Sequence, residues 1–271
     1  MNMKNNSESS ASLSSNIWTK IRDDLVKNRY IHIMAIPVIV YYILFHYGPM
    51  YGVIIAFKDF VPTRGILGSK WVGLKHFISF IQDFNFTRVV RNTFLINLYN
   101  LLFGFPIPII FALLLNELRN DKFKRVTQTI TYLPHFISIV VVSGIIKDFV
   151  SSNGVIVQIL VNFFGMAETD LLQKSNLFRS IYVSTEIWQR FGWNSIIYIA
   201  ALSGIDPTYY EAAVVDGAGR FKQTMKITLP SIAPTIIILL ILRLGQMMSL
   251  GFEKIILLYN PLTYETADVI Q

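Results

Sequence analysis

Five stretches of the chain carry few or no charged residues and are long enough to cross a bilayer as helices. A hydrocarbon core of about 30 Å requires roughly 20 apolar residues in helical conformation. Three stretches, Arg29–Lys58, Arg91–Glu117 and Arg125–Lys147, have no Asp, Glu, Lys or Arg between their end residues. Two others, Phe178–Ile205 and Ile227–Phe252, contain few. The pattern predicts an all-α membrane protein with five transmembrane helices.

A further uncharged stretch, Phe149–Ala167, has a different pattern. It opens with the polar run Ser151–Gly154, and its later apolar residues recur in pairs at the spacing of one helix face. A one-sided apolar pattern is typical of a helix that lies in the membrane interface. We therefore expect this stretch not to span the bilayer.

The residues that flank the apolar stretches indicate the orientation of the chain in the membrane. Residues 1–15 are rich in Ser and Asn and are predicted to be a disordered cytoplasmic tail, followed by a basic flank at 16–29 and a transmembrane domain at 30–271. Lys and Arg also gather at 119–125 and at 220–226. Because cytoplasmic loops carry the excess of Lys and Arg, the N-terminus is predicted to be cytoplasmic, and residues 205–229 with it.

Composition supports a membrane protein and excludes several other classes. The chain is 53% hydrophobic and only 15% charged, whereas soluble domains carry about 25% charged residues. The net charge of +7 follows from the basic loops and gives no reason to expect nucleic-acid binding. There are no cysteines, the four histidines lie far apart, and no GxSxG nucleophile turn is present. We therefore predict no metal site, no cofactor and no enzymatic activity in this chain.

The loop at 205–230 is predicted to contain a short helix followed by a sharp turn. The helix can be capped by Asp206, or by a capping box at Thr208–Glu211. Gly217 and Gly219 allow a turn that side chains would resist. Such a helix could insert into a groove on a partner protein, but a simple surface helix explains the pattern equally well.

The residues of this loop resemble a known motif. Glu211-Ala212-Ala213, then Gly217, then Ile227-x-Leu229-Pro230 are similar, position for position, to the EAA loop of ABC importer permeases. The resemblance implies that 205–230 is the coupling loop, which docks onto a separate ATPase subunit. Because the chain has no GxxxxGK[ST] loop, ATP and Mg would be bound by that subunit. The implied ATPase-coupling residues are Tyr210, Glu211, Ala212, Ala213, Asp216, Gly217, Ala218 and Gly219.

Other segments narrow the resemblance to carbohydrate importers. Residues 47–60, 71–77, 192–194 and 251–261 are similar to maltose-type permeases for oligosaccharides and polysaccharide fragments. The resemblance implies the type I ABC importer permease fold, a place in the cytoplasmic membrane, and a heterodimer with a second homologous permease. It also implies two copies of a cytoplasmic ABC ATPase, an extracytoplasmic sugar-binding protein, and a sixth core helix that these 271 residues do not include. Two alternatives stay open, a permease for another small solute and a truncated subunit that does not transport.

Polar residues within the predicted spans are candidates for the substrate path, because intramembrane polar groups usually face a cavity or a neighbouring helix. Aromatic rings stack on sugars and amides bond to hydroxyl groups. The candidates are Trp193, Asn194, Tyr198, Gln189, Gln246 and Asn100, and helix packing is an alternative explanation for them. We interpret Glu186 and Arg190, four residues apart, as a structural ion pair. We interpret Arg243 as paired with a neighbouring residue or as extending its charged group toward the membrane surface, and not as a sugar ligand.

Overall fold

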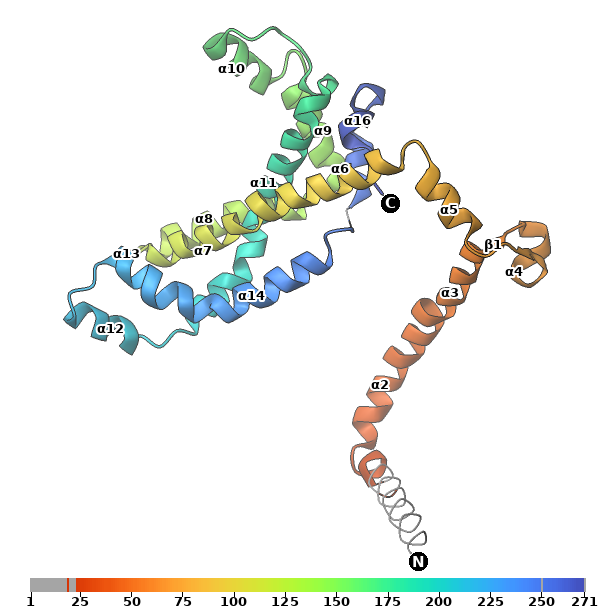
Figure 1. Ribbon diagram of the computed structural model, residues 1–271. Helices are drawn as coiled ribbons and strands as arrows, with labels where there is room; N and C mark the ends of the chain where they lie inside the picture. The colour runs from red at the N-terminus through yellow and green to blue at the C-terminus, as the bar shows by residue number, and fades with distance from the viewer. Residues whose placement is uncertain (1–18, 20–22, 250, 271) are drawn as a thin grey trace, which may run out of the picture. The chain divides into compact units, whose positions relative to one another are not determined.

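The computed structural model describes residue 19, residues 23–249 and residues 251–270, most of which are helical (Figure 1). The predicted tail at 1–15 lies outside the described residues. The chain divides into two compact units, unit 1 (Met1–Asp83) and unit 2 (Phe84–Gln271). Their boundary lies within the stretch 30–271 that the sequence predicts as one domain.

Unit 1 begins with a long apolar helical segment, Arg29–Phe57, at the place of the first predicted span. Its hydrogen-bond pattern changes from α to π to 3₁₀ along the way, and no residue of its first helix is buried in the protein. The apolar side chains of this segment are therefore available to lipid or to another chain. The segment consists of α2 (Arg29–Tyr42), η1 (Ile43–Tyr47), α3 (Gly48–Met50) and η2 (Tyr51–Phe57).

A small hairpin and a short helix complete unit 1. Strand β1 (Lys58–Asp59) pairs antiparallel with β2 (Lys70–Trp71), with Lys58 opposite Trp71. The Lys58 Nζ donates a hydrogen bond of 2.7 Å to the Ile66 carbonyl, which closes the loop between the strands. The remaining elements are η3 (Pro62–Arg64), α4 (Gly65–Gly68) and α5 (Lys75–Gln82).

Unit 2 opens with the second apolar segment, which runs continuously over Phe86–Glu117 and so begins five residues before the predicted span. It comprises α6 (Phe86–Tyr99), the π-helix η4 (Asn100–Gly104) and α7 (Pro106–Glu117). Pro106 stands at the first position of α7, where a missing amide hydrogen costs little. The two prolines that the sequence places in this span are thus accommodated because the π-helix η4 ends before them and a new helix, α7, begins at the first of them.

The third predicted span, Arg125–Lys147, is wrong as a single helix. Helix α8 (Asp121–Tyr132) gives way to a 3₁₀ turn, η5 (Leu133–Phe136), and α9 (Ile139–Val150) begins afterwards. Pro134 explains the break, because it has no amide hydrogen to donate and its ring clashes with the preceding turn. An absence of charge alone does not reveal this interruption.

Helix α10 (Val155–Phe164) is separate from α9, as the sequence predicts for the stretch after Ser151–Gly154. It ends at Gly165, which has the left-handed φ of 65° that favours glycine at a helix C-terminus. In Figure 1, α10 turns away from the axis of α9. Its place in the membrane interface stays a prediction.

Helix α11 (Ser175–Ser203) is the longest element and packs against α7, α8, α14 and α16. The loop after it contains α12 (Thr208–Val215), and a continuous helical segment then covers Arg220–Gly245. The fifth predicted span, Ile227–Phe252, therefore has wrong bounds, since the helix starts in the basic loop and ends at Gly245. This segment consists of α13 (Arg220–Gln223), η7 (Thr224–Thr228) and α14 (Leu229–Gly245).

Four segments in the described residues are long and apolar enough to span a membrane: Arg29–Phe57, Phe86–Glu117, Ile139–Phe164 and Arg220–Gly245. The third of them joins α9 and α10 across the turn at 151–154, and so includes the stretch that the sequence predicts not to span. Helix α11 is not among them, because its charged and polar residues lower its mean hydropathy. The predicted count of five is therefore not confirmed. The chain continues through α15 (Phe252–Leu258), η8 (Pro261–Thr263) and α16 (Tyr264–Ala267).

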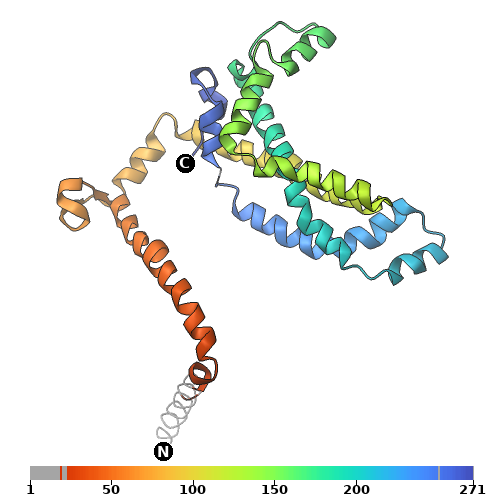
Figure 2. The same cartoon turned by 180° about the vertical axis from the view of Figure 1, so that it is seen from behind.

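Helix α11 joins the two buried clusters of unit 2. Phe178 and Tyr182 pack with α6, α9 and α15, whereas Tyr198 and Leu202 pack with α7 and α14. Where α11 crosses α8, a side chain at Gly192 would collide with the backbone carbonyl of Thr131. Figure 2, seen from behind, shows α11 running through the middle of this unit.

Candidate transport cavity and coupling loop

The start of α12 is set by Asp206. The amide of Thr208 donates a hydrogen bond of 2.9 Å to the Asp206 carboxylate. This bond favours the ionised carboxylate and lowers the pKa of Asp206. Of the two caps considered from the sequence, the Asp206 cap is therefore formed, and the box at Thr208–Glu211 is not, because Thr208 is already the first residue of the helix.

The turn after α12 depends on one of the two glycines. Gly217 has φ +69°, in the left-handed region that residues with a Cβ rarely adopt. Gly219 has φ −69°, which other residues adopt readily. The Ala218 amide donates to the Ala213 carbonyl at 2.8 Å across the turn. The sharp turn was predicted correctly, but the need for glycine lies at Gly217 alone.

Two hydrogen bonds tie the loop to the beginning of the α13–α14 segment. The Tyr210 hydroxyl shares a hydrogen bond of 2.9 Å with the Thr228 Oγ1, and Thr228 is buried in η7. The Gln223 Nε2 donates to the Ala218 carbonyl at 2.7 Å. Side-chain hydrogen bonds therefore connect α12 and the turn after it to the helical segment that leads into α14.

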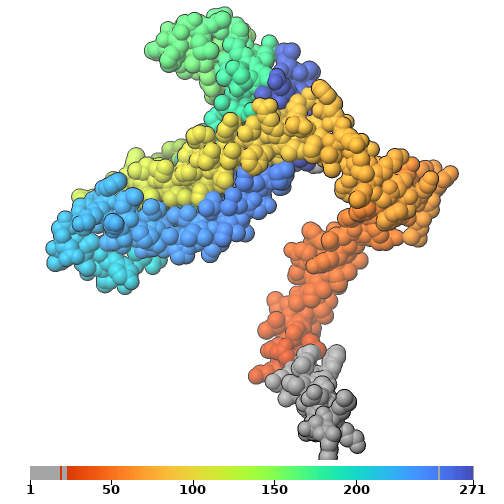
Figure 3. All heavy atoms as spheres, viewed as in Figure 1, coloured from red at the N-terminus to blue at the C-terminus, as the bar shows by residue number. Residues whose placement is uncertain are grey.

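The loop exposes apolar side chains that the motif did not indicate. Val215 is 87% exposed and Phe221 is 81% exposed, and Tyr209 and Val214 are also exposed. Among the predicted coupling residues, Glu211, Ala212, Asp216, Gly217 and Gly219 are exposed, and Tyr210, Ala213 and Ala218 are half-buried. Figure 3 shows α12 and α13 at one end of unit 2. The sequence signal for these contacts was the presence of four apolar residues in a loop that also carries charged residues.

A cavity of about 250 Å³ with a mixed polar and apolar lining lies between η4–α7, α11 and α14. Four of the six predicted substrate-path residues line it: Asn100, Asn194, Tyr198 and Gln246. The lining also includes Glu186, Arg190 and Arg243, which the sequence analysis interpreted as structural. The cavity therefore combines amide, aromatic, aliphatic and charged side chains from three parts of the chain.

The structure places the other two candidates outside this cavity. Trp193 stacks flat on His135, with ring centroids 4.4 Å apart, and meets Phe136 edge-on. These contacts join α11 to the η5 turn. Gln189 is buried in the protein, on a part of α11 that does not line the cavity.

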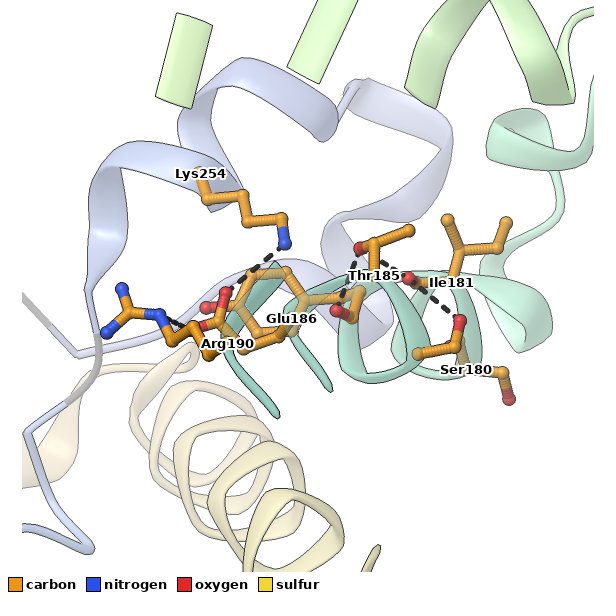
Figure 4. A network of polar contacts seen from close by, with 8 residues as sticks. Ser180, Ile181, Thr185, Glu186, Arg190 and Lys254 are labelled. Atoms are coloured by element: carbon orange, nitrogen blue, oxygen red, sulfur yellow. Dashed lines mark hydrogen bonds and ion pairs between the residues drawn. The ribbon is translucent and has the colours of Figure 1, made fainter. Parts of the chain in front are cut away.

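Three charged residues, Glu186, Arg190 and Lys254, form a network of ion pairs next to the cavity (Figure 4). Glu186 pairs with Arg190, as the i, i+4 spacing predicts, and also with the Nζ of Lys254 at 3.2 Å. The Lys254 side chain is 1% exposed, and its Nζ lies 5.4 Å from the centre of the Tyr182 ring. The sequence did not indicate Lys254, because it lies 68 residues from Glu186.

Further polar contacts hold residues 251–270 against the rest of unit 2. The Asn92 Nδ2 donates to the carbonyls of Glu265 and Asp268, at 3.0 and 2.9 Å. Arg88 pairs with the Asp268 carboxylate at 2.8 Å, and the Asn260 Nδ2 donates to the Leu172 carbonyl at 3.0 Å. This segment is thus fixed to α6 and to the 3₁₀ turn η6 (Leu171–Gln173), which precedes α11.

All residues that line the cavity except Asn100, and the whole loop at 205–230, lie within a stretch that matches a known family. The family described as "Binding-protein-dependent transport system inner membrane component" matches residues 104–262, more than half of the chain. This chain belongs to that family. It is a permease subunit and not an enzyme, as the sequence predicts. No group of three or more metal-ligating side chains occurs in the described part of this permease.

Similar proteins include other permeases of ABC importers. The chain is 43% identical over 245 residues to the polygalacturonan/rhamnogalacturonan transport system permease protein YteP of Bacillus subtilis, covering 90% of this chain and 76% of YteP. A crystal structure of a bacterial ABC transporter involved in the import of the acidic polysaccharide alginate matches with a TM-score of 0.83 and 43% identity, covering 92% of this chain and 84% of that chain.

A second crystal structure shows a bacterial alginate ABC transporter in complex with an alginate pentasaccharide-bound periplasmic protein. It matches this permease with a TM-score of 0.82 and 43% identity, covering 91% of this chain and 82% of that chain. These matches confirm the predicted fold class, that of an ABC importer permease.

Proposed function

We propose that this permease is one transmembrane subunit of an ATP-driven importer that moves an oligosaccharide or a polysaccharide fragment into the cytoplasm. One observation carries the proposal: α11 and α14, which line the cavity, are joined directly by the loop that contains α12. A partner that moves this loop moves two walls of the cavity. The substrates in the names of the similar transporters, polygalacturonan and alginate, are polysaccharides.

The proposed orientation follows from the basic residues. The N-terminus and the loop at 205–230 face the cytoplasm, and residues 251–270 face outward. Helix α11 is the fourth crossing in this topology, although its polar residues keep it below the hydropathy of the four apolar segments. A helix with polar residues is stable in a membrane when those residues face a cavity or neighbouring helices.

The proposed assembly contains four kinds of subunit. A second, homologous permease completes the pathway, and two copies of a cytoplasmic ATPase bind ATP and Mg. An extracytoplasmic protein delivers the sugar. The exposed side chains of Val215 and Phe221 are the main apolar contacts with the ATPase, alongside the predicted residues from Tyr210 to Gly219. A rigid helix in a groove converts closure of the ATPases into rotation of the attached helices.

Reconstitution tests this function. Proteoliposomes that contain the permease, its partner permease and the ATPases should accumulate a labelled oligosaccharide only when ATP and the sugar-loaded binding protein are supplied. Liposomes without this chain are the control. ATP-driven uptake of amino acids or metal ions in place of sugars, or no ATP-driven uptake of any solute, would contradict the proposal.

The bond between Tyr210 and Thr228 provides a specific prediction about coupling. Tyr210→Phe removes one hydroxyl and leaves the Oγ1 of the buried Thr228 without its side-chain partner. A lost hydrogen bond costs about 1 kcal/mol, so we expect roughly a fivefold lower ratio of sugar imported to ATP hydrolysed. The measurement is uptake and ATPase rate in the same vesicles.

Tyr209→Phe is the matched control for this test. Tyr209 is the neighbouring residue, is exposed, and makes no hydrogen bond through its hydroxyl to the described residues. We expect this variant to keep the normal ratio. Equal ratios for the two variants would show that the Tyr210–Thr228 bond carries no coupling.

A further inference from the structure

We propose that the exposed face of α8 binds an anionic phospholipid of the cytoplasmic leaflet. The phosphate lies at the start of the helix, and an acyl chain lies along the apolar side chains that follow. The inference rests on the proposed function for its orientation, which places the turn between α7 and α8 on the cytoplasmic side. The surface is separate from the sites described above, since α8 neither lines the cavity nor belongs to the loop at 205–230.

Helix α8 has one face packed on the protein and another left open. On the packed face, the backbone carbonyl of Thr131 lies against Gly192 of α11. The open face carries four apolar side chains, each between 55% and 61% exposed: Phe123, Val126, Ile130 and, where α8 passes into η5, Leu133. Their spacing of three and four residues places them on one side of the helix. We call these four residues the α8 stripe.

The α8 stripe has the length of one lipid leaflet. From Phe123 to Leu133 a helix rises about 15 Å, at about 1.5 Å per residue. The hydrocarbon core of a bilayer is about 30 Å thick, so one leaflet contributes about 15 Å. The stripe ends where Pro134 interrupts the helix. An acyl chain that starts at the cytoplasmic end of α8 therefore reaches the bilayer centre at this interruption.

Exposed cations stand at the cytoplasmic end of the α8 stripe. They are Arg119, Lys122 and Arg125. No ion pair joins their side chains to a residue within the described ranges. Of the acids nearby, Glu117 is engaged by Arg220 at 3.7 Å, and Asp121 lies in the first turn of α8, where the helix dipole favours a negative charge. The three cations are thus available to a ligand.

Side chains, and not the end of the helix, would recognise the phosphate. The Asn120 side chain already accepts hydrogen bonds from the amides of Lys122 and Phe123, at 3.0 and 3.1 Å. Lys122 lies four residues before Val126, so its ammonium group can stand above the first turn of the stripe. A lysine and an arginine at headgroup depth attract anionic lipids.

The cations also favour a lipid over a second protein as the occupant of this face. A permease helix packed on the α8 stripe would bury Lys122 and Arg125 unless it supplied acidic partners, and an unpaired buried charge is costly. A phospholipid carries its own phosphate at the right depth. Charge and apolar length therefore match the two parts of one anionic lipid molecule.

Quenching by brominated lipids tests the proposal. The chain contains no cysteine, so Ile130→Cys provides one site for a fluorophore in the middle of the stripe, in an assembled importer whose other subunits are also cysteine-free. Nanodiscs contain phosphatidylglycerol and phosphatidylcholine, and the quenching bromine atoms are on the acyl chains of one lipid or of the other.

We expect a relative binding constant of at least about fivefold in favour of phosphatidylglycerol. Because the attraction is ionic, added salt should reduce this preference. Equal quenching by the two lipids would show an unselective lipid surface. No quenching by either lipid would show that a protein covers the stripe. Each of these two results would overturn the proposal.

Charge variants assign the preference to the start of α8. In the labelled chain, Lys122→Gln/Arg125→Gln should abolish the preference and leave quenching by phosphatidylcholine unchanged. Lys70→Gln/Lys75→Gln removes two exposed cations from unit 1 and should leave the preference intact. A normal basal ATPase rate verifies that each complex is assembled. A preference that survives the loss of Lys122 and Arg125 would reject this site.

The test separates this inference from the proposed function, because quenching requires neither sugar nor ATP. If the importer accumulates sugar with ATP but shows no preference for phosphatidylglycerol at Ile130→Cys, the inference fails and the function stands. If the preference is present but no solute is taken up with ATP, the lipid site stands and the function fails.

Discussion

Replacing Val215 with aspartate is expected to abolish ATP-driven uptake. Val215 ends α12 and is 87% exposed, so the substitution changes nothing in the interior of the permease. In the proposed complex this side chain enters an apolar groove, where an unpaired charge costs about 3 kcal/mol or more. We expect the ATPase to dissociate on size-exclusion chromatography and uptake to fall more than about a hundredfold.

Two companion variants make this test specific. An aspartate near a helix C-terminus weakens the helix slightly, whereas a lysine there is favourable. If the apolar groove causes the defect, Val215→Lys should therefore abolish docking as well. If Val215→Asp acts only by weakening α12, Val215→Lys should dock normally. Leu67→Asp, at an 84% exposed residue of α4, is the control and should assemble normally. An importer with Val215→Asp that still retains its ATPase would contradict the proposed role of α12.

Replacing Glu186 with glutamine is expected to destabilise unit 2 strongly. Lys254 is 1% exposed and depends on the Glu186 carboxylate at 3.2 Å, so the substitution leaves a buried ammonium without a counter-charge. Removing one partner of a buried ion pair costs about 3–5 kcal/mol. We expect a lower unfolding temperature in detergent and proteolytic cleavage within residues 251–270, which Lys254 helps to hold against α11.

A second substitution should reverse this effect. Lys254→Met removes the stranded charge while keeping a side chain of similar length, so the double variant Glu186→Gln/Lys254→Met should recover most of the lost stability. Glu168→Gln is the control, because Glu168 is exposed and forms no ion pair with the described residues. Failure of the double variant to recover would show that Glu186 stabilises the unit by another contact.

Several features of this permease could be predicted from local patterns. The uncharged runs located the apolar segments that begin at Arg29 and Phe86, because helix insertion depends mainly on the summed hydropathy of a segment. The turn at Gly217 was predictable because its φ of +69° is a local backbone requirement. The third span was predicted wrongly, since counting charges ignored the interruption at Pro134.

The substrate path could be predicted only in part. Trp193 and Asn194 are adjacent on α11, yet Asn194 lines the cavity and Trp193 stacks on His135. Successive residues of a helix point about 100° apart, and α11 has polar residues on several sides. Its sequence therefore does not show which side faces the cavity.

The amino-acid sequence by itself determined the membrane class, the position of the helix and sharp turn in the loop at 205–230, and the absence of a GxxxxGK[ST] motif from these 271 residues. All three follow from residues that are close together in the chain. Only the tertiary structure decided that Lys254 pairs with Glu186 and that Asn194 lines the cavity whereas Trp193 stacks on His135. The physical reason is that the charge balance of a cavity is set by residues from distant helices, and those helices meet only when the chain folds.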